Sequence, residues 1–171
     1  MEKFSNKTKS KTFLVKDYYY TMNNMNEHFS VGIEDSENPW RWQVVIFGPK
    51  NTLHEDAVYN GEFFFPENYP DSPPRFKFNS AMFHPNIEPD GTVCISILHE
   101  SGDDVYGYET EAERWKPIYK PGDIIMAIVS ILDDPNCESP ANLDAAQAFL
   151  HDRVNYDRRV KRCAADSLDN L

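Results

Sequence analysis

Long apolar runs are missing from the sequence, and no stretch approaches the roughly 18 apolar residues that a membrane span needs. Basic residues are also scarce: 17 Lys and Arg are set against 28 Asp and Glu, which leaves a formal net charge of -11 at pH 7. Such a surface repels phosphate backbones and anionic lipids, so nucleic-acid binding and direct membrane insertion are both excluded as expected functions. The polar first residues are unlike a secretion signal. We therefore expect a soluble, cytoplasmic protein.

Cysteines are few and widely spaced, at Cys94, Cys137 and Cys163. They form neither a CxxC pair nor a Cys/His ligand pattern, so neither a disulfide framework nor a zinc site is expected. In a reducing compartment they remain thiols, and most free cysteines are buried apolar side chains rather than nucleophiles. With 171 residues, 40% of them hydrophobic, the chain suits a single domain, 1–171, with its core at about 12–168.

The spacing of apolar residues predicts an α+β fold. After a polar lead, apolar residues at four-residue spacing predict a first helix at 14–22. Three further helices are predicted at 123–132, 143–150 and 155–168. Alternating apolar residues predict strands at 29–33, 42–46, 58–65 and 75–78. Turn-forming residues separate these strands, so we expect a four-stranded antiparallel meander. The nearly uniform apolar character of 123–132 predicts a central buried helix.

Residues 79–120 show little periodicity, and a long irregular stretch in a compact domain is usually functional. Here His84-Pro85-Asn86 is followed by the turn residues Asp90-Gly91 and then by Cys94. A thiolate is both a strong nucleophile and a good leaving group, so this cysteine suits a carrier that accepts an acyl group and then releases it. The amide of Asn86 can donate to the oxyanion that forms when a thioester is attacked, and it can also tie down its own loop.

The motif of His84-Pro85-Asn86 followed by Cys94 resembles the active-site signature of ubiquitin-conjugating enzymes. Further pieces of the family's pattern occur in the family's order between Leu14 and Leu168, and although each is common alone, their combination is specific. These pieces are Trp42, Gly48-Pro49 with Thr52, Tyr69-Pro70, Pro73-Pro74, Trp115, Asp134-Pro135-Asn136 and Ser139-Pro140.

The resemblance implies a ubiquitin-conjugating fold, with an N-terminal helix, the meander, a central helix and C-terminal helices. It implies a transferase that accepts ubiquitin from the activating enzyme as a thioester on Cys94 and passes it to a lysine of a protein substrate. A RING-type ligase would promote this transfer, which we expect to build polyubiquitin chains for proteasomal degradation. No metal or other cofactor is implied, since ATP is used by the activating enzyme. Recruitment to the endoplasmic reticulum surface or the nucleus stays open.

Residues 94–114 resemble the G-type branch of the family, which has an extended acidic loop beside the active site. An acceptor lysine is mostly protonated at neutral pH, and we hypothesise that Asp103 and Asp104 attract and position it. The alternative is a solvated acidic loop without a catalytic part. The carboxylates of the loop are Glu100, Asp103, Asp104, Glu109, Glu111 and Glu113.

Further side chains are expected to support the active site. The resemblance gives His84 a bracing role in its loop rather than the role of a base, and its proline neighbour restricts its backbone. Many family members carry an acid directly before the proline that matches Pro140, but this sequence has Ser139 there, so that role falls to Glu138 or to the loop acids. For His99, a pH-dependent gate and a structural part both stay open.

The loops around Pro73 and Pro117 resemble the family's ligase-facing surface, and Pro73, Pro117 and Ile118 are apolar enough to carry binding energy. Where many members have an apolar residue, this sequence has Asp71, which should disfavour HECT-type ligases because burying an unpaired carboxylate is costly. The N-terminal basic residues match, loosely, the surface that meets the activating enzyme. They are Lys7, Lys9, Lys11 and Lys16.

Three other functions compete with this interpretation. A conjugating enzyme for another ubiquitin-like modifier would share every catalytic feature, although the acidic loop argues against it. An inactive variant that only binds ubiquitin or its partners typically lacks the cysteine, and Cys94 is present. A cysteine hydrolase would pair Cys94 with His99 or His84, but it also needs an orienting third group, and no hydrolase signature surrounds the cysteine.

Overall fold

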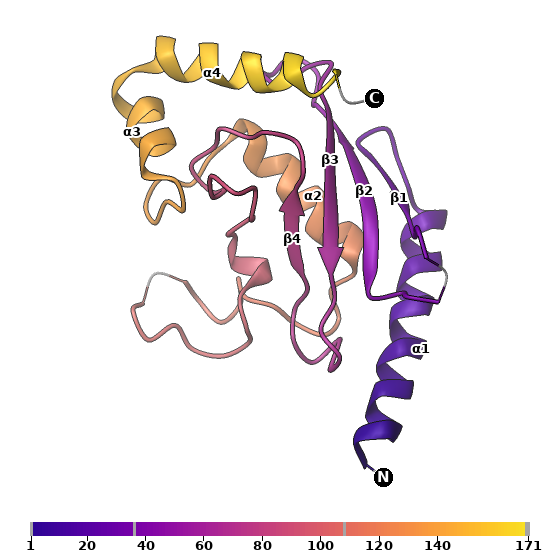
Figure 1. Ribbon diagram of the computed structural model, residues 1–171. Helices are drawn as coiled ribbons and strands as arrows, with labels where there is room; N and C mark the ends of the chain where they lie inside the picture. Colours follow the sequence, from indigo (N-terminus) through magenta and orange to yellow (C-terminus); the bar gives the residue numbers. More distant parts are fainter. Residues whose placement is uncertain (1, 36, 108, 170–171) are drawn as a thin grey trace.

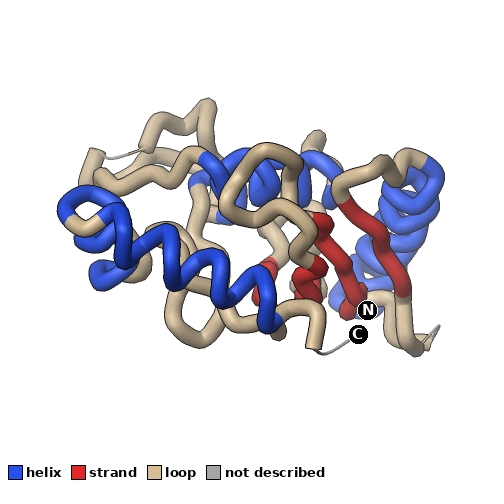
Figure 2. Tube along the Cα trace, turned by 90° about the horizontal axis from the view of Figure 1, so that it is seen from above, coloured by secondary structure: helices blue, strands red, loops and turns tan. Residues whose placement is uncertain are grey.

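The structure, a computed structural model, describes residues 2–35, 37–107 and 109–169, with side chains from residue 8 onward. In Figure 1, α2 runs behind the sheet while α3 and α4 lie across one end, and Figure 2 shows the strands between α1 and α3. The helices are α1 (Glu2–Asn23), α2 (Pro121–Asp133), α3 (Leu143–His151), α4 (Arg153–Asp166) and the short 3-10 helix η1 (Ser96–Leu98). The strands are β1 (Phe29–Gly32), β2 (Arg41–Phe47), β3 (Val58–Phe64) and β4 (Arg75–Phe78).

The predicted antiparallel meander is confirmed, since the strands pair in the order β1-β2-β3-β4. Along β2 the side chains alternate between core and surface, so that Trp42, Val44 and Ile46 are buried. Between them, Gln43 faces away from the core and its Nε2 donates to Oε1 of Glu62 on β3 (2.6 Å). A one-residue slip would move the three apolar side chains to the outer face, so burial fixes the register of this pairing.

α2 is the central buried helix that its composition predicted. The Asp123 carboxylate caps its first turn by accepting the backbone N–H of the residue before the helix (2.8 Å), and Pro121 occupies a position where no intrahelical donor is needed. Ile124, Ile125 and Ile128 are fully buried in the main core. Within the described part of the chain, no helix combines the length and apolar character needed to cross a membrane.

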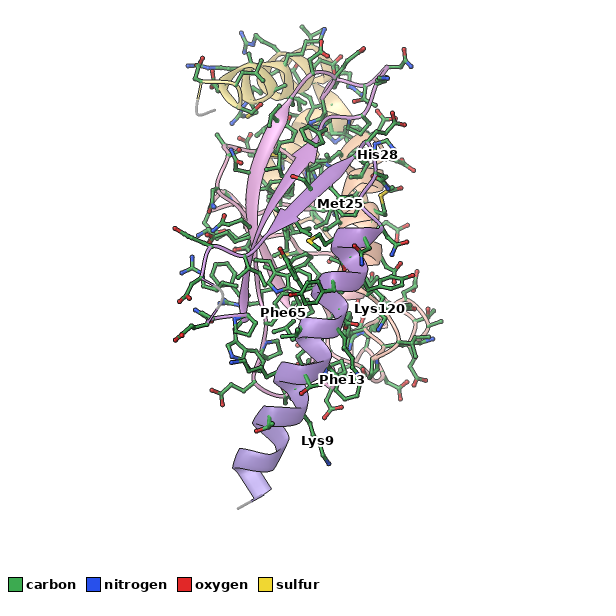
Figure 3. All side chains as sticks on the ribbon, turned by 90° about the vertical axis from the view of Figure 1, so that its right-hand side faces the viewer. Lys9, Phe13, Met25, His28, Phe65 and Lys120 are labelled. Atoms are coloured by element: carbon green, nitrogen blue, oxygen red, sulfur yellow. The ribbon has the colours of Figure 1, made fainter. Side chains whose placement is uncertain are left out.

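α1 begins earlier than the apolar spacing predicted, because the polar lead is helical from Glu2 onward. Figure 3 shows this part of the helix, near Lys9, extending beyond the rest of the molecule. Lys and Glu are good helix formers, so a helix that packed residues have nucleated continues without further apolar contacts. Leu14, Asp17 and Thr21 are buried and supply that packing. Apolar periodicity therefore located the packed part of α1 and missed its polar start.

A hairpin formed by residues 84–94 extends the sheet beyond β4. The backbone N–H of Phe78 donates to the carbonyl of Gly91 (2.9 Å), and the N–H of Val93 donates to the carbonyl of Phe76 (3.0 Å). Gly91 adopts a φ of +94°, and a Cβ at this position would lie 2.1 Å from the Phe78 carbonyl oxygen. Conformation and space thus both require glycine where the hairpin docks on β4.

Gly91→Ala is expected to lower the free energy of unfolding by about 2 to 4 kcal/mol, because alanine is strained at positive φ and its methyl group would collide with β4. Urea denaturation followed by circular dichroism measures the change. Gly32→Ala is the matched control, because nothing lies within 4 Å of a Cβ there, and Ala for Gly at an unstrained site is neutral or stabilising by up to about 1 kcal/mol. Equal stabilities of the two variants would contradict the docking described for the hairpin.

Candidate active site

The hairpin sorts its side chains onto two faces, because neighbouring residues of an extended segment point in opposite directions. Ile87 and Val93 pair across it and are buried in the main core. Asn86, Glu88 and Cys94 therefore share the opposite face, with Glu88 diagonally across from Cys94. The backbone N–H of Cys94 donates to the Asn86 carbonyl (2.9 Å), which fixes this register.

An open hollow of about 660 Å³ lies on this outer face of the hairpin. Its walls come from the hairpin, the segment with η1, the acidic loop, α2 and the turn at 136–141. Segments that are far apart in the sequence therefore meet around one thiol. The predicted site residues that line the hollow are Asn86, Cys94, Asp104, Glu138 and Ser139.

Cys94 is partly buried, and its thiol donates to Oε1 of Glu88 (3.4 Å). Burial, the hydrogen bond to Glu88 and the negative charges of Glu88 and Asp90 together raise the pKa of the Cys94 thiol to about 11. The free thiol is therefore protonated at neutral pH. It acts as a nucleophile only when its proton leaves during the reaction or when a bound partner changes its surroundings.

The side chain of Asn86 is buried and bonded twice to the backbone of Asn136: Nδ2 donates to the carbonyl (2.7 Å), and Oδ1 accepts the N–H (2.9 Å). A flipped amide would set donor against donor, so these bonds fix its orientation. Asn86 thus ties the hairpin to the turn after α2. Its amide carries a second N–H, so a role in stabilising an oxyanion is compatible with these bonds and stays a prediction.

His84 is fully buried, and both of its ring nitrogens are engaged. Nδ1 accepts the backbone N–H of Asn86 (3.0 Å), so Nε2 carries the ring proton and donates to the Ile131 carbonyl on α2 (2.6 Å). Burial lowers the pKa of His84 to about 4, which keeps the ring neutral at physiological pH. This arrangement braces the hairpin against α2 and leaves no ring nitrogen to serve as the base of a cysteine hydrolase.

The acidic loop is organised around the carboxylate of Glu109. This carboxylate accepts from Ser96 Oγ (3.0 Å) and Arg114 Nε (3.1 Å) and lies 2.8 Å from His99 Nδ1. Burial alone would raise the pKa of Glu109, but the hydrogen bonds from His99, Ser96 and Arg114 outweigh it and lower the pKa. Arg114 also pairs with Asp104 (3.6 Å). The described part of the loop is therefore held against η1 by charge pairs rather than being wholly solvated.

The two carboxylates predicted to position the acceptor lie in different surroundings. Asp104 faces inward, and its oxygens accept the backbone N–H groups of Tyr106 (3.0 Å) and Glu109 (3.1 Å), which turns the loop on itself. Asp103 is exposed and is not among the residues that line the hollow. The structure does not bring the two together at Cys94, and their part in binding an acceptor stays a prediction.

The two predicted ligase-facing loops are neighbours, because the Trp115 indole N–H donates to the Pro70 carbonyl (2.8 Å). Ile118, on one of these loops, has 75% of its surface exposed. This end of the molecule therefore presents an exposed apolar side chain, and the neighbouring loop carries the exposed carboxylate of Asp71. The predicted ligase-binding side chains, all exposed or partly exposed, are Asp71, Pro73, Pro117 and Ile118.

α1 is tied to the same end of the molecule through Asp17. Its carboxylate accepts from the Tyr69 hydroxyl (2.7 Å) and from Lys120 Nζ (2.7 Å), and Figure 3 shows Lys120 beside the helix. The basic residues predicted to meet the activating enzyme are exposed along this helix at Lys9, Lys11 and Lys16, whereas the side chain of Lys7 lies outside the described residues.

The other two cysteines are not among the residues that line the hollow, although Cys137 belongs to the turn at 136–141 that forms one of its walls. Cys137 and Cys163 are partly buried, and burial raises the pKa of both thiols. Cys163 packs against the second apolar cluster, which α3 and α4 help to form. Within residues 2–35, 37–107 and 109–169, no three His, Cys, Asp or Glu side chains gather in a way that could hold a metal ion.

Two parts of the site were not identified from the sequence pattern. Glu88 belongs to no motif, although treating Pro89-Asp90-Gly91 as a three-residue hairpin loop would have placed it diagonally across from Cys94. The pairing of Glu109 with Arg114 was also missed, because charges in an irregular loop give no periodic signal that indicates which of them meet.

Known proteins similar to this chain agree with the geometry. The family model described as ubiquitin-conjugating enzyme matches residues 13–164. The chain is 42% identical over 162 residues to ubiquitin-conjugating enzyme E2 15 of Schizosaccharomyces pombe, which covers 95% of this chain and 97% of that protein. It is 47% identical over 143 residues to ubiquitin-conjugating enzyme E2 14 of Arabidopsis thaliana, covering 84% and 86% of the two chains. It is 43% identical over 155 residues to ubiquitin-conjugating enzyme E2 G2 of Homo sapiens, covering 91% and 94%.

A cysteine thiol set in an open hollow, beside a His84 ring whose two nitrogens are both engaged, suits an acyl carrier that works through a thioester. The chain belongs to the ubiquitin-conjugating enzyme family, whose members are transferases that carry ubiquitin as a thioester, and it falls in the G-type branch. Enzymes of this family work with ubiquitin, an activating enzyme, ligases and protein substrates. The predictions of family, fold and enzyme class are thereby confirmed.

Acid should destabilise the protein through two buried histidines before its carboxylates titrate. Burial lowers the pKa of His54, whose ring nitrogens contact Tyr59 and the Leu132 carbonyl, to about 4, as it does for His84. An unfolded histidine has a pKa of about 6.5. Between about pH 6.5 and 4 the unfolded chain therefore binds protons that the folded chain does not, and the free energy of unfolding falls as pH falls.

Urea denaturation should show a loss of about 2 to 4 kcal/mol between pH 7 and pH 5. His54→Gln is expected to show a smaller loss over the same interval than the wild-type protein, because one of the two buried rings is gone. A free energy of unfolding that stays constant from pH 7 to pH 5 would mean that the two histidines are not held neutral by the fold.

Proposed function

We propose that Cys94 is the residue that accepts ubiquitin from the activating enzyme and holds its C-terminus as a thioester. The observation that carries the proposal is the place of the thiol in the hollow, beside Asn86 and the turn at 136–141. Cys137 and Cys163 do not line that hollow. The proposed reaction needs no metal or other cofactor on this chain, because ATP is consumed by the activating enzyme before ubiquitin reaches the thiol.

Transfer to a lysine requires an amine nitrogen to attack the thioester carbonyl carbon, which places negative charge on the carbonyl oxygen. The second N–H of Asn86 can donate to that oxygen from an amide that Asn136 already orients, and such a donor is worth about 10²–10³ in rate. Glu138 in the hollow and Asp103 on the exposed part of the acidic loop would attract the lysine ammonium. Asp104 would act indirectly, by holding that loop in shape.

We further propose that a RING-type ligase promotes the transfer and that its products are polyubiquitin chains for protein degradation. The exposed side chain of Ile118, next to Pro117, supports a ligase contact of the kind that carries much of a binding energy. Asp71 opposes a HECT-type partner that would bury an apolar residue against it. The proposed place of action is the cytoplasm, with recruitment to the endoplasmic reticulum surface or the nucleus.

Incubation with ubiquitin, activating enzyme and Mg-ATP should give an adduct on a non-reducing gel that a thiol reagent removes. Cys94→Ala should abolish the adduct, since alanine has no nucleophile. Cys94→Ser should give an adduct that survives the thiol reagent, because its hydroxyl forms an oxygen ester. The readout is the band that the reducing agent removes.

Cys137→Ser and Cys163→Ser are the matched controls for this experiment, because each removes a thiol that does not line the hollow. Both variants should form the ubiquitin thioester to the same extent as the wild-type protein. A reducible adduct that persists in Cys94→Ala would assign the carrier to another cysteine. The absence of an adduct under conditions that charge a known ubiquitin-conjugating enzyme would argue for a different modifier.

Ile118→Ala should reduce the stimulation of ubiquitin discharge by a RING-type ligase about tenfold, because losing a central apolar contact costs about 1 to 2 kcal/mol of binding. The measurement is the ratio of discharge rates of the preformed thioester with and without the ligase. Val154→Ala is the matched control, since this side chain is 82% exposed but belongs to α4, away from the ligase-facing loops. Equal stimulation of the two variants would place the ligase elsewhere.

A further inference from the structure

The carboxylate of Glu88 lies against the reactive sulfur, and nothing described so far gives it a chemical part. Its Oε1 accepts the hydrogen bond of the Cys94 thiol at 3.4 Å. Both side chains leave the hairpin on the same face, and both line the hollow. An amine that reaches a thioester on Cys94 through the hollow therefore passes beside Glu88.

The backbone of the hairpin sets the position of Glu88. Its N–H donates to the Thr92 carbonyl (2.8 Å), and its carbonyl accepts the N–H of Gly91 (2.8 Å). Asp90 closes the same turn by accepting the Thr92 N–H (2.9 Å). The carboxylate is exposed, but it extends from a Cα that is fixed one diagonal step from Cys94.

Two other carboxylates around the hollow pair with an arginine instead of the sulfur. Glu109 and Asp104 both pair with Arg114 inside the acidic loop. Glu138 extends from the turn after α2, where its backbone N–H bonds to the Asn136 side chain. Among the described residues, Glu88 is the carboxylate that hydrogen-bonds the sulfur of Cys94.

We propose that Glu88 is a catalytic residue that accepts a proton when ubiquitin passes from Cys94 to an amine, an inference that rests on the carrier function proposed for Cys94. The free enzyme is the product state of that transfer, so the hydrogen bond from Sγ–H to Oε1 indicates where the last proton comes to rest. An acylated sulfur has no proton, and the carboxylate then faces the incoming amine. Its negative charge also attracts a protonated lysine.

The step balances without a further reactant. The lysine first loses one proton to solvent, and its neutral nitrogen then forms a bond to the thioester carbonyl carbon. Glu88 accepts the excess proton from this nitrogen while the bond between the carbonyl carbon and Sγ breaks and leaves its electron pair on sulfur. Because the pKa of the Cys94 thiol is raised to about 11, the thiolate that leaves is a strong base, and the proton then moves from Glu88 to Sγ.

The test compares Glu88→Gln and Glu88→Asp with Glu34→Gln, a matched change of charge at an exposed glutamate just beyond β1, on the opposite edge of the sheet from β4. Each protein is charged with ubiquitin, charging is stopped, and single-turnover loss of the thioester to free lysine is followed. Glu88→Gln should slow this discharge at least about tenfold, since a positioned base supplies about 10²–10⁴ in rate. Glu88→Asp should keep part of the rate, and Glu34→Gln should keep all of it.

Alkylation of the Cys94 thiol in the protein without ubiquitin, together with a measurement of stability, separates a chemical role of Glu88 from damage to the hairpin. Iodoacetamide should modify Cys94 faster in Glu88→Gln than in the wild-type protein, because a charge that keeps the proton on sulfur has been removed. Because a distorted hairpin could also expose Cys94 and speed alkylation, urea denaturation is measured in parallel, and Glu88→Gln should keep the free energy of unfolding of the wild-type protein. All proteins in this comparison also carry Cys137→Ser and Cys163→Ser, so that Cys94 is the thiol whose alkylation is measured.

Lysine discharge of Glu88→Gln at the wild-type rate would overturn the role of Glu88 while leaving Cys94 as the carrier. An equal loss in the Asp and Gln variants would overturn it as well, because the carboxylate would then not be the group that matters. The role of Glu88 would also be overturned if the wild-type thioester were lost no faster with lysine than in buffer alone. Failure of the wild-type protein to form any thioester would instead remove the carrier function on which the inference rests.

Discussion

The place of the Cys94 thiol depends on the backbone hydrogen bonds that join β4 to the hairpin of residues 84–94. These bonds occupy an edge of the sheet that would otherwise expose unpaired N–H and carbonyl groups. They also carry the alternation of the sheet into the hairpin, so that Ile87 and Val93 enter the core. Burial of these two side chains obliges Cys94 to face outward, and the core of the protein thereby decides where its chemistry takes place.

Two kinds of polar interaction then divide the site into a rigid part and a part that responds to solution conditions. Around the thiol the bonds are neutral and buried: His84 and Asn86 join the hairpin to α2 and to Asn136. Breaking one would leave a buried polar group unpaired at a cost of about 1 to 3 kcal/mol. The acidic loop is held instead by the charges of Glu109 and Arg114 near the surface, where salt screens such pairs. High ionic strength should therefore loosen the loop while the thiol keeps its place.

Features with a periodic or ordered signal could be predicted from the sequence. The alternation of Trp42, Val44 and Ile46 predicted a strand because burial on one face imposes a period of two. The apolar character of 123–132 likewise predicted α2. The polar start of α1 gave no such signal, since its sequence has no run of regularly spaced apolar residues. Glu88 was missed for a related reason. The register of the hairpin brings Glu88 close to Cys94, and this register can be predicted only when the loop at the tip of the hairpin is recognised.

The raised pKa of Cys94 bears on both halves of the carrier reaction proposed for it. Burial and the carboxylate of Glu88 disfavour the thiolate, so the sulfur is both a slower nucleophile and a poorer leaving group than a free cysteine. The thioester itself carries no charge and is not destabilised by these effects. The same negative field attracts a lysine ammonium to the hollow before it loses its proton, whereas a neutral water molecule gains nothing from it. These electrostatics thus favour a cationic acceptor, which is a form of selectivity that needs no binding pocket for the rest of the substrate.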